Sequence, residues 1–336
     1  TFLNYENLNL YIPSRPPGFP IYELLVGIIF KFSNNSNFIN PEQGLIIFQF
    51  CVVIALNFLI YSFFKNSSRK NFLIYLLIVA SPIYLISGLS VIDYFLGSIF
   101  GFLSVYQILN NYDSKFIVIN TSLFLGISIG IRLSNIIFLV VIFFFIIFYK
   151  NNKSNAFFIG SLTVLIASLI YLPFYNNLYS FFIEKGIYSS PLDLTCMLNL
   201  TNTDHDLFGR LGRFFLKQIN FFGTLGFLTF LFLLKDFKLK TDSQNFIFIG
   251  IFLLFQLSFL RLPTEEGHLL PAFIAFLLIL NNQKTINSIV LIITIGLVFS
   301  SNFINIKFYD VDTDESASEI VFNVDFENGL YLKDYD

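Results

Sequence analysis

Long apolar runs recur along the whole chain and constrain its fold more than any other feature. A helix needs about 20 apolar residues to cross the hydrocarbon core of a bilayer. The clear runs lie at about 43–64, 71–89, 91–110, 132–149, 156–175, 216–234, 245–261 and 286–302, with two shorter ones at 116–130 and 268–281. The sequence therefore predicts an all-α fold, a polytopic transmembrane helical bundle with about ten spans.

The charge content excludes several other classes of protein. Only 12% of the 336 residues are charged, against about 25% in soluble domains, and the mean hydropathy is +0.72. Such a chain is neither an ordinary water-soluble domain nor a disordered one. The 20 Lys and Arg are scattered and the net charge is -2, so no nucleic-acid partner is expected. With two His and two distant Cys, no metal site is identified.

The chain divides into a membrane domain, 1–302, and a short acidic tail outside the cytoplasm, 303–336. Within the first, 1–42 reads as an outer loop in which residues 20–32 form an interfacial helix, too short to span. The alternation of apolar and polar residues at 319–326 indicates a small strand or hairpin, although a solvated end is the alternative. The chain starts at Thr1, and we expect one further span upstream.

Four short basic loops set the expected orientation. They lie at 65–70, 150–153, 235–240 and 281–285, and the alternation of spans puts all four on one side. Since Lys and Arg accumulate in cytoplasmic loops, that side is expected to be the cytoplasm. The protein would then be a multi-pass protein of the cell (inner) membrane.

The notable ionisable residues outside these loops all fall on the other side. They are Glu6, Arg15, Glu23, Asp93, Arg132, Arg210, Arg213, Arg261, Glu265, Glu266 and His268. Ionisable groups in or beside spans are costly, which makes them functional candidates. A transporter would place its charges near the midplane, at broken helices. A one-sided set predicts an active site at the membrane surface, for a substrate that is half lipid and half water-soluble.

Several of these residues also have a purely structural interpretation. Asp93 could favour the start of a helix through capping and the helix dipole. Arg132, in GIRLSN, could reach the lipid headgroups or, beside Ser134 and Asn135, bind phosphate. Arg210 and Arg213 read as interfacial anchors. The segment RLPTEEGHLLP could be a plain polar turn, but that would not explain its four ionisable groups.

The N-terminal stretch carries a family resemblance. Within YIPSRPPGFPIYE, the three Pro and the Gly of SRPPGFP forbid a continuous helix and give a rigid loop that carries Arg15. The chain resembles the GT-C class of membrane glycosyltransferases, which use polyprenyl-phosphate-linked sugars. The resemblance rests on this loop, the following surface helix, the Ser-Pro at the end of a later span, Asp93, GISIGIR and RLPTEEGHLLP. The layout covers nearly the whole chain.

The resemblance implies an inverting glycosyl transfer without a covalent enzyme intermediate. Glu6 would be the base that activates the acceptor, and Asp93 a second acid that orients the acceptor or holds an Arg. Arginines suit the donor phosphate because their planar fork binds phosphate oxygens. The candidates for this role are Arg15, Arg132 and Arg261. The sugar or acceptor pocket would be lined by Tyr11, Glu265, Glu266 and His268.

The resemblance also implies the partners, and other functions stay open beside it. The donor would be a lipid-linked sugar and the acceptor a glycan, a lipid or a protein; some relatives need a divalent cation. Three other functions stay open: a lipid-linked sugar transporter or flippase, a polysaccharide polymerase or ligase that uses the long loop at 176–215, and a structural subunit.

Overall fold

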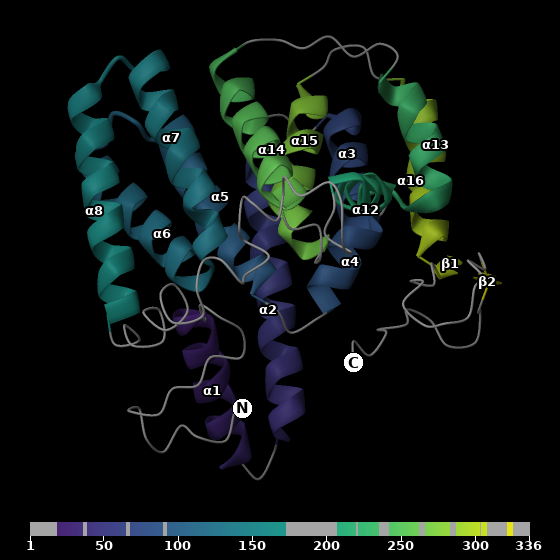
Figure 1. Cartoon of the computed structure of the whole chain (residues 1–336), viewed down its shortest axis with the longest axis horizontal. Coiled ribbons are helices and arrows are strands. Elements are labelled where there is room, and N and C mark those ends of the chain that lie inside the picture. Colours follow the sequence, from purple (N-terminus) through teal and green to yellow (C-terminus); the bar gives the residue numbers. More distant parts are fainter. Residues whose placement is uncertain are drawn as a thin grey trace.

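The structure is a computed structural model that describes residues 19–35, 39–64, 68–89, 93–172, 207–219, 221–234, 242–261, 266–282, 287–302, 304–307 and 321–324. Its helices stand side by side as a bundle (Figure 1). In chain order they are α1 (Pro20–Asn34), α2 (Pro41–Ser62), α3 (Arg69–Ala80), α4 (Pro82–Leu89), α5 (Tyr94–Asn110), α6 (Ile117–Ile131), the 3-10 turn η2 (Leu133–Asn135), α7 (Ile136–Tyr149), α8 (Lys153–Tyr171), α12 (Leu207–Ile219), α13 (Gly223–Leu234), α14 (Ser243–Arg261), the 3-10 turn η5 (Glu266–Leu269), α15 (Leu270–Asn281) and α16 (Ser288–Ser301).

Helix starts follow local capping chemistry. Pro41 opens α2, and the side chain of Gln43 accepts a hydrogen bond from the backbone of Asn40 at 3.2 Å. Ser68 accepts from the backbone N–H of Asn71 at the start of α3, where the distance is 3.2 Å. These side chains satisfy amide groups that have no partner inside the helix. Local sequence therefore fixes where these helices begin.

The helices have the apolar surface of a membrane protein. Phe58 on α2, Phe157 on α8 and Leu257 on α14 are more than 60% exposed, as are many other large apolar side chains on the outside of the bundle. Soluble monomers rarely expose apolar surface on this scale. An all-helical bundle compatible with a membrane is thus confirmed, whereas the number of spans is a separate matter.

Among the described residues, three helices are long and apolar enough to cross a membrane: α2, α8 and α14. The bent pair α3–α4 makes a fourth if it counts as one span. The helices α5, α6, α7, α15 and α16 are apolar but shorter. The expected count of about ten is therefore not confirmed by helix length.

Two of the expected continuous spans are broken. The span expected at 71–89 bends by 56° between α3 and α4, because Pro82 cannot donate a helical hydrogen bond and holds Ser81 extended (ψ 142°). The span expected at 216–234 is split into α12 and α13. Gly223 at this break has φ +68°, and a Cβ there would collide with Ser301.

The described residues that flank three of the basic loops lie together at one end of the bundle (Figure 1). Lys70 Nζ donates to the carbonyl of Asn281 at 2.5 Å, which joins the start of α3 to the end of α15. Asn282 Nδ2 donates to Asn245 Oδ1 at 2.7 Å, which joins the end of α15 to the start of α14. The residues that flank the α2–α3, α13–α14 and α15–α16 connections therefore lie together.

The fourth basic loop, between α7 and α8, lies at the same end. Tyr149 packs on Phe246 near the start of α14, with ring centroids 4.9 Å apart. Lys150 Nζ lies 4.6 Å from the ring centroid of Tyr112. We call this end, defined by Lys70, Lys150 and their partners, the lysine-rich end. The residues grouped at this end are those that the alternation of spans along the sequence places on one side.

Beyond the bundle, two short strands pair with each other. β1 (Ile304–Lys307) is antiparallel to β2 (Val321–Val324), and Ile304 lies opposite Val324. β2 falls inside the segment 319–326 that the alternation singled out. The segment expected to be helical at 20–32 forms α1, which packs on α2 and also touches α6 and α8.

Candidate functional site

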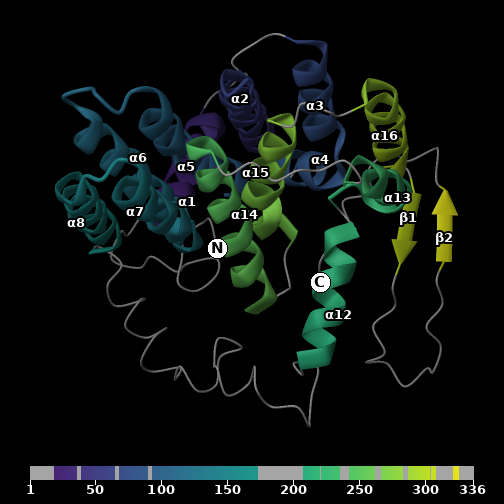
Figure 2. The same ribbon diagram turned by 90° about the horizontal axis from the view of Figure 1, so that it is seen from above.

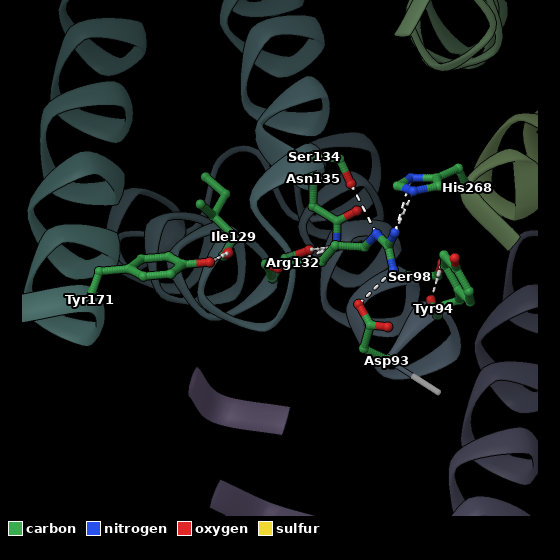
Figure 3. A network of polar contacts seen from close by, with 10 residues as sticks. Asp93, Tyr94, Ser98, Ile129, Arg132, Ser134, Asn135, Tyr171 and His268 are labelled. Atoms are coloured by element: carbon green, nitrogen blue, oxygen red, sulfur yellow. Dashed lines mark hydrogen bonds and ion pairs between the residues drawn. The ribbon is translucent and has the colours of Figure 1, made fainter. Parts of the chain in front are cut away.

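Arg132 is the centre of a polar cluster (Figure 3). It lies at the end of α6, opposite the lysine-rich end. It caps the end of α6 with an extended backbone, φ -152° and ψ 118°, and the chain then enters η2. All three guanidinium nitrogens have partners: Nη1 on Asp93, Nη2 on His268 and Nε on Ser134. An arginine held at every nitrogen has a fixed orientation.

The shortest carboxylate contact is with Asp93, whose Oδ2 lies 2.7 Å from Arg132 Nη1. The two side chains are only 4% and 7% exposed, so this is a buried ion pair. Asp93 is the residue before α5, but its carboxylate makes no capping hydrogen bond to that helix. Asp93 therefore pairs with Arg132 and does not cap the helix that it precedes.

His268 closes the cluster from a different part of the chain, the turn η5. Its Nε2 lies 2.6 Å and its Nδ1 3.1 Å from Arg132 Nη2. A guanidinium only donates hydrogen bonds, so the ring nitrogen that contacts Nη2 must accept the hydrogen bond. His268 is therefore neutral in this arrangement, and it is a weaker partner for the cation than an anion would be.

Aromatic rings cover the guanidinium. The carbon Cζ of Arg132 lies 4.0 Å from the ring centroid of Tyr94 and 5.5 Å from that of Phe19. Tyr94 also meets His268 edge to face, at 5.5 Å between ring centroids. Gly267 allows this approach, because a Cβ at that position would collide with the Tyr94 ring. Cation–π contact adds to the ion pair and screens it from water.

A second layer of hydrogen bonds holds α5 and α6 in place below the cluster. Ser128 Oγ donates to the carbonyl of Gly97 at 2.8 Å, and Asn135 Nδ2 donates to Ser128 Oγ at 3.1 Å. Tyr171 on α8 donates to the carbonyl of Ile129 at 3.2 Å, as Figure 3 shows. These contacts fix the turn that presents Arg132.

Tyr22 on α1 lies within the electrostatic reach of the same site. Burial raises the pKa of its phenol, and the negative charge of Asp93 raises this pKa further. Its buried hydroxyl makes no hydrogen bond to any residue that the structure describes. A buried hydroxyl beside a buried charge is a polar group ready to accept a partner.

Of the nine predicted site residues, three converge here: Asp93, Arg132 and His268. For Arg261 and Glu266 the structure describes only the backbone, which places them at the end of α14 and the start of η5. The remaining four lie outside the described residues: Glu6, Tyr11, Arg15 and Glu265.

Sequence reasoning missed two members of the cluster, Tyr94 and Phe19. Tyr94 follows Asp93 directly, and an aromatic residue next to a candidate ion pair was the available signal. Phe19 gives no such signal, because only the packing of α1 brings it near Arg132. Within the described ranges no three His, Cys, Asp or Glu are grouped so as to hold a metal ion.

No protein-family model, curated protein sequence or solved structure matches this chain.

Proposed function

We propose that this protein is an integral-membrane glycosyltransferase with about ten spans, which moves a sugar from a polyprenyl-phosphate donor to an acceptor outside the cytoplasm. The observation that carries the proposal is the convergence of Asp93, Arg132 and His268. They come from three distant segments, and they meet at the end of the bundle opposite the lysine-rich end. One site at one membrane boundary is what a donor with an apolar tail and a polar head requires.

Arg132 is proposed to bind the donor phosphate. Its Nη2 faces the neutral ring of His268, while Nη1 stays on Asp93. A phosphate oxygen forms a charge-assisted hydrogen bond, which is stronger than one to a neutral ring nitrogen. The phosphate would therefore displace His268 and leave the Asp93 pair in place. Stabilising the leaving phosphate is the electrostatic part of the catalysis.

The other roles follow from this position of the phosphate. His268, once displaced, would line the sugar or acceptor pocket, with Tyr11, Glu265 and Glu266. Glu6 is the proposed base, which takes the acceptor proton as the sugar–oxygen bond forms. Asp93 holds Arg132, and Arg15 and Arg261 complete the phosphate site.

A transporter of lipid-linked sugars is the second candidate, and one observation favours it. The pair α3–α4 is a broken helix with a bend of 56°, and α4 contacts η5, the turn that carries His268. Transporters often place their sites at broken helices. The two functions differ in outcome: a transferase breaks the sugar–phosphate bond, whereas a transporter moves the donor intact.

Binding of undecaprenyl phosphate to the purified full chain in detergent tests the phosphate site. Arg132→Lys keeps the charge that pairs with Asp93 but loses the planar fork, so we expect at least about tenfold weaker binding in thermophoresis. Lys150→Gln, which removes a charge from the lysine-rich end, is the matched control and should bind as the wild type does. Unchanged affinity in Arg132→Lys would reject the phosphate site.

Sealed proteoliposomes containing a radiolabelled polyprenyl-phosphate hexose then separate the two functions. Transfer of label to a water-soluble or lipid acceptor, lost in Glu6→Gln and reduced in Asp93→Asn, supports the transferase. Label that crosses the bilayer still attached to its lipid supports the transporter and contradicts the transferase. Size-exclusion profiles of each variant check that it is folded.

A further inference from the structure

The helix α12 lies across the bundle rather than along it. Figure 1 shows it nearly end-on while its neighbours run lengthwise, and the perpendicular view of Figure 2 shows it along its length. Its 13 residues would span about 20 Å, which is less than the hydrocarbon thickness. Its direction across the bundle is that of a helix in the plane of the membrane, and its short length fits this placement.

The positions of charge along α12 are one-sided. With 100° per residue, Arg210, Arg213 and Lys217 fall within an arc of about 60° on the helix. Positions Phe208 and Phe215 lie on the opposite side of the helix. A narrow basic face with a broad apolar face is the pattern of helices that lie at a membrane interface.

The bundle holds α12 along one flank. The side chains of Gln218 and Gln256 exchange two hydrogen bonds, of 3.0 and 2.8 Å, which tie α12 to α14. Phe214 packs on Phe259 at 6.2 Å between ring centroids. The basic positions lie to one side of this flank. On the other side Phe215 is 64% exposed, as expected for a ring in lipid.

The place of α12 along the bundle axis follows from its neighbours. It leads into α13, whose first turn is held by Ser301: the backbone N–H of Leu225 donates to Ser301 Oγ at 3.1 Å. Ser301 ends α16, a helix that starts just after the basic loop at 281–285. α12 therefore lies near the boundary opposite the lysine-rich end, the boundary where Arg132 also lies.

We propose that α12 is an in-plane interfacial helix whose basic face binds the anionic head groups of membrane phospholipids. Phosphate groups at this depth meet three cations spaced along one side of the helix, while the aromatic side enters the acyl region. This inference does not depend on the glycosyltransferase proposal. Head-group binding would hold the boundary near Arg132 rich in anionic lipid.

The sequence contains no Trp, so a single introduced Trp reports on its own surroundings. In the full chain with Phe215→Trp, reconstituted into phosphatidylcholine and phosphatidylglycerol bilayers, fluorescence quenching is compared with one or the other lipid brominated. At equal mole fractions and low salt we expect quenching to show about threefold or greater local enrichment of phosphatidylglycerol. Arg210→Gln/Arg213→Gln/Lys217→Gln should bring the enrichment to about one.

Leu169→Trp is the matched control for depth. Leu169 is 59% exposed near the end of α8 at the same boundary, and no basic position lies within one turn of it on that helix. It should show equal quenching by both lipids. If the triple variant does not fold, raising the salt to about 0.5 M with the native charges should reduce the enrichment at position 215 instead.

Three results would overturn the proposal. One is equal quenching by the two lipids at position 215. Another is an enrichment that survives both removal of the three charges and high salt. The third is no quenching by either brominated lipid, which would place α12 outside the membrane.

Discussion

The two ends of the helical bundle handle charge in opposite ways. At the lysine-rich end, Lys70 and Lys150 meet a backbone carbonyl and an aromatic ring, and the Lys150 side chain is exposed to solvent. At the other end, Arg132 and Asp93 are buried together, and His268 and Tyr94 complete their surroundings. The first arrangement costs little and sets orientation. The second is costly to desolvate and is kept where a charge must be held in one place.

This contrast teaches that the effect of a charged residue on stability depends more on its burial than on the number of charges around it. Exposed lysines can be exchanged with small effect, because water solvates them in any conformation. A buried pair depends on both partners, because either one alone would be an unsolvated charge. The predictions below test this contrast, from the largest expected effect to the smallest.

The largest effect concerns sidedness. In a chain whose Cys51 and Cys196 are replaced by Ser, single cysteines at positions 15 and 261 should react with an impermeant maleimide from outside the cell. Cysteines at positions 150 and 238 should react only after the membrane is opened. Detergent-solubilised protein, in which all four should react, is the control. Reaction of positions 15 and 261 from different sides would remove the shared site.

The second effect is on stability. Arg132→Gln leaves Asp93 buried without its cation and should lower the free energy of unfolding by about 3–5 kcal/mol. Lys150→Gln should cost no more than about 1 kcal/mol, the strength of an exposed cation–π contact. Unfolding in mixed micelles with increasing SDS measures both. Similar losses in the two variants would contradict the contrast between the ends.

The third test replaces both partners of the buried ion pair instead of one. Arg132→Met combined with Asp93→Leu replaces the buried pair by apolar side chains, and it should recover about 2 kcal/mol or more of what Arg132→Gln loses. The same titration measures it. The double variant should also lose undecaprenyl phosphate binding, so stability and binding separate. A double variant as unstable as Arg132→Gln would show that the pair is not the source of the loss.

The smallest effect compares two glycines. A Cβ at Gly97 would lie 2.5 Å from Asn135 Nδ2, in the layer that supports Arg132, whereas at Gly160 the nearest atom is 3.8 Å away on Phe143. Gly97→Ala should therefore cost about 1–3 kcal/mol, and Gly160→Ala should be neutral or stabilising by up to about 1 kcal/mol. Equal effects in the SDS titration would mean that the support layer adapts freely.

The sequence was a good guide to which segments are helical. Each expected apolar run contains a helix, because burial of apolar surface in lipid or in the bundle overrides most local preferences. It was a poor guide to where helices break. Pro82 was visible as part of a Ser-Pro pair, but a proline inside a helix sometimes bends it and sometimes does not. Gly223 gave no signal, because its positive φ and its lack of a side chain matter only where Ser301 packs closely against it.

The candidate site was predicted in part. Asp93, Arg132 and His268 were singled out because ionised groups are costly beside a membrane. Their mutual contacts were not predicted, and neither were Tyr94 and Phe19 as the rings around Arg132. A helix-start role for Asp93 was equally open, because a carboxylate before a helix has the same sequence pattern whether it caps or pairs.

The sequence by itself determined that this chain is a bundle of apolar helices in which the helix ends that flank its basic loops lie together. Both properties follow from local composition. Long apolar runs are unfavourable in water and are buried in lipid or in the bundle, and alternate connections between spans lie on the same side. Only the tertiary structure decided which charges meet, where the helices bend and that α12 lies across the bundle. Those features depend on contacts between segments far apart in the chain, whose distances no local pattern contains.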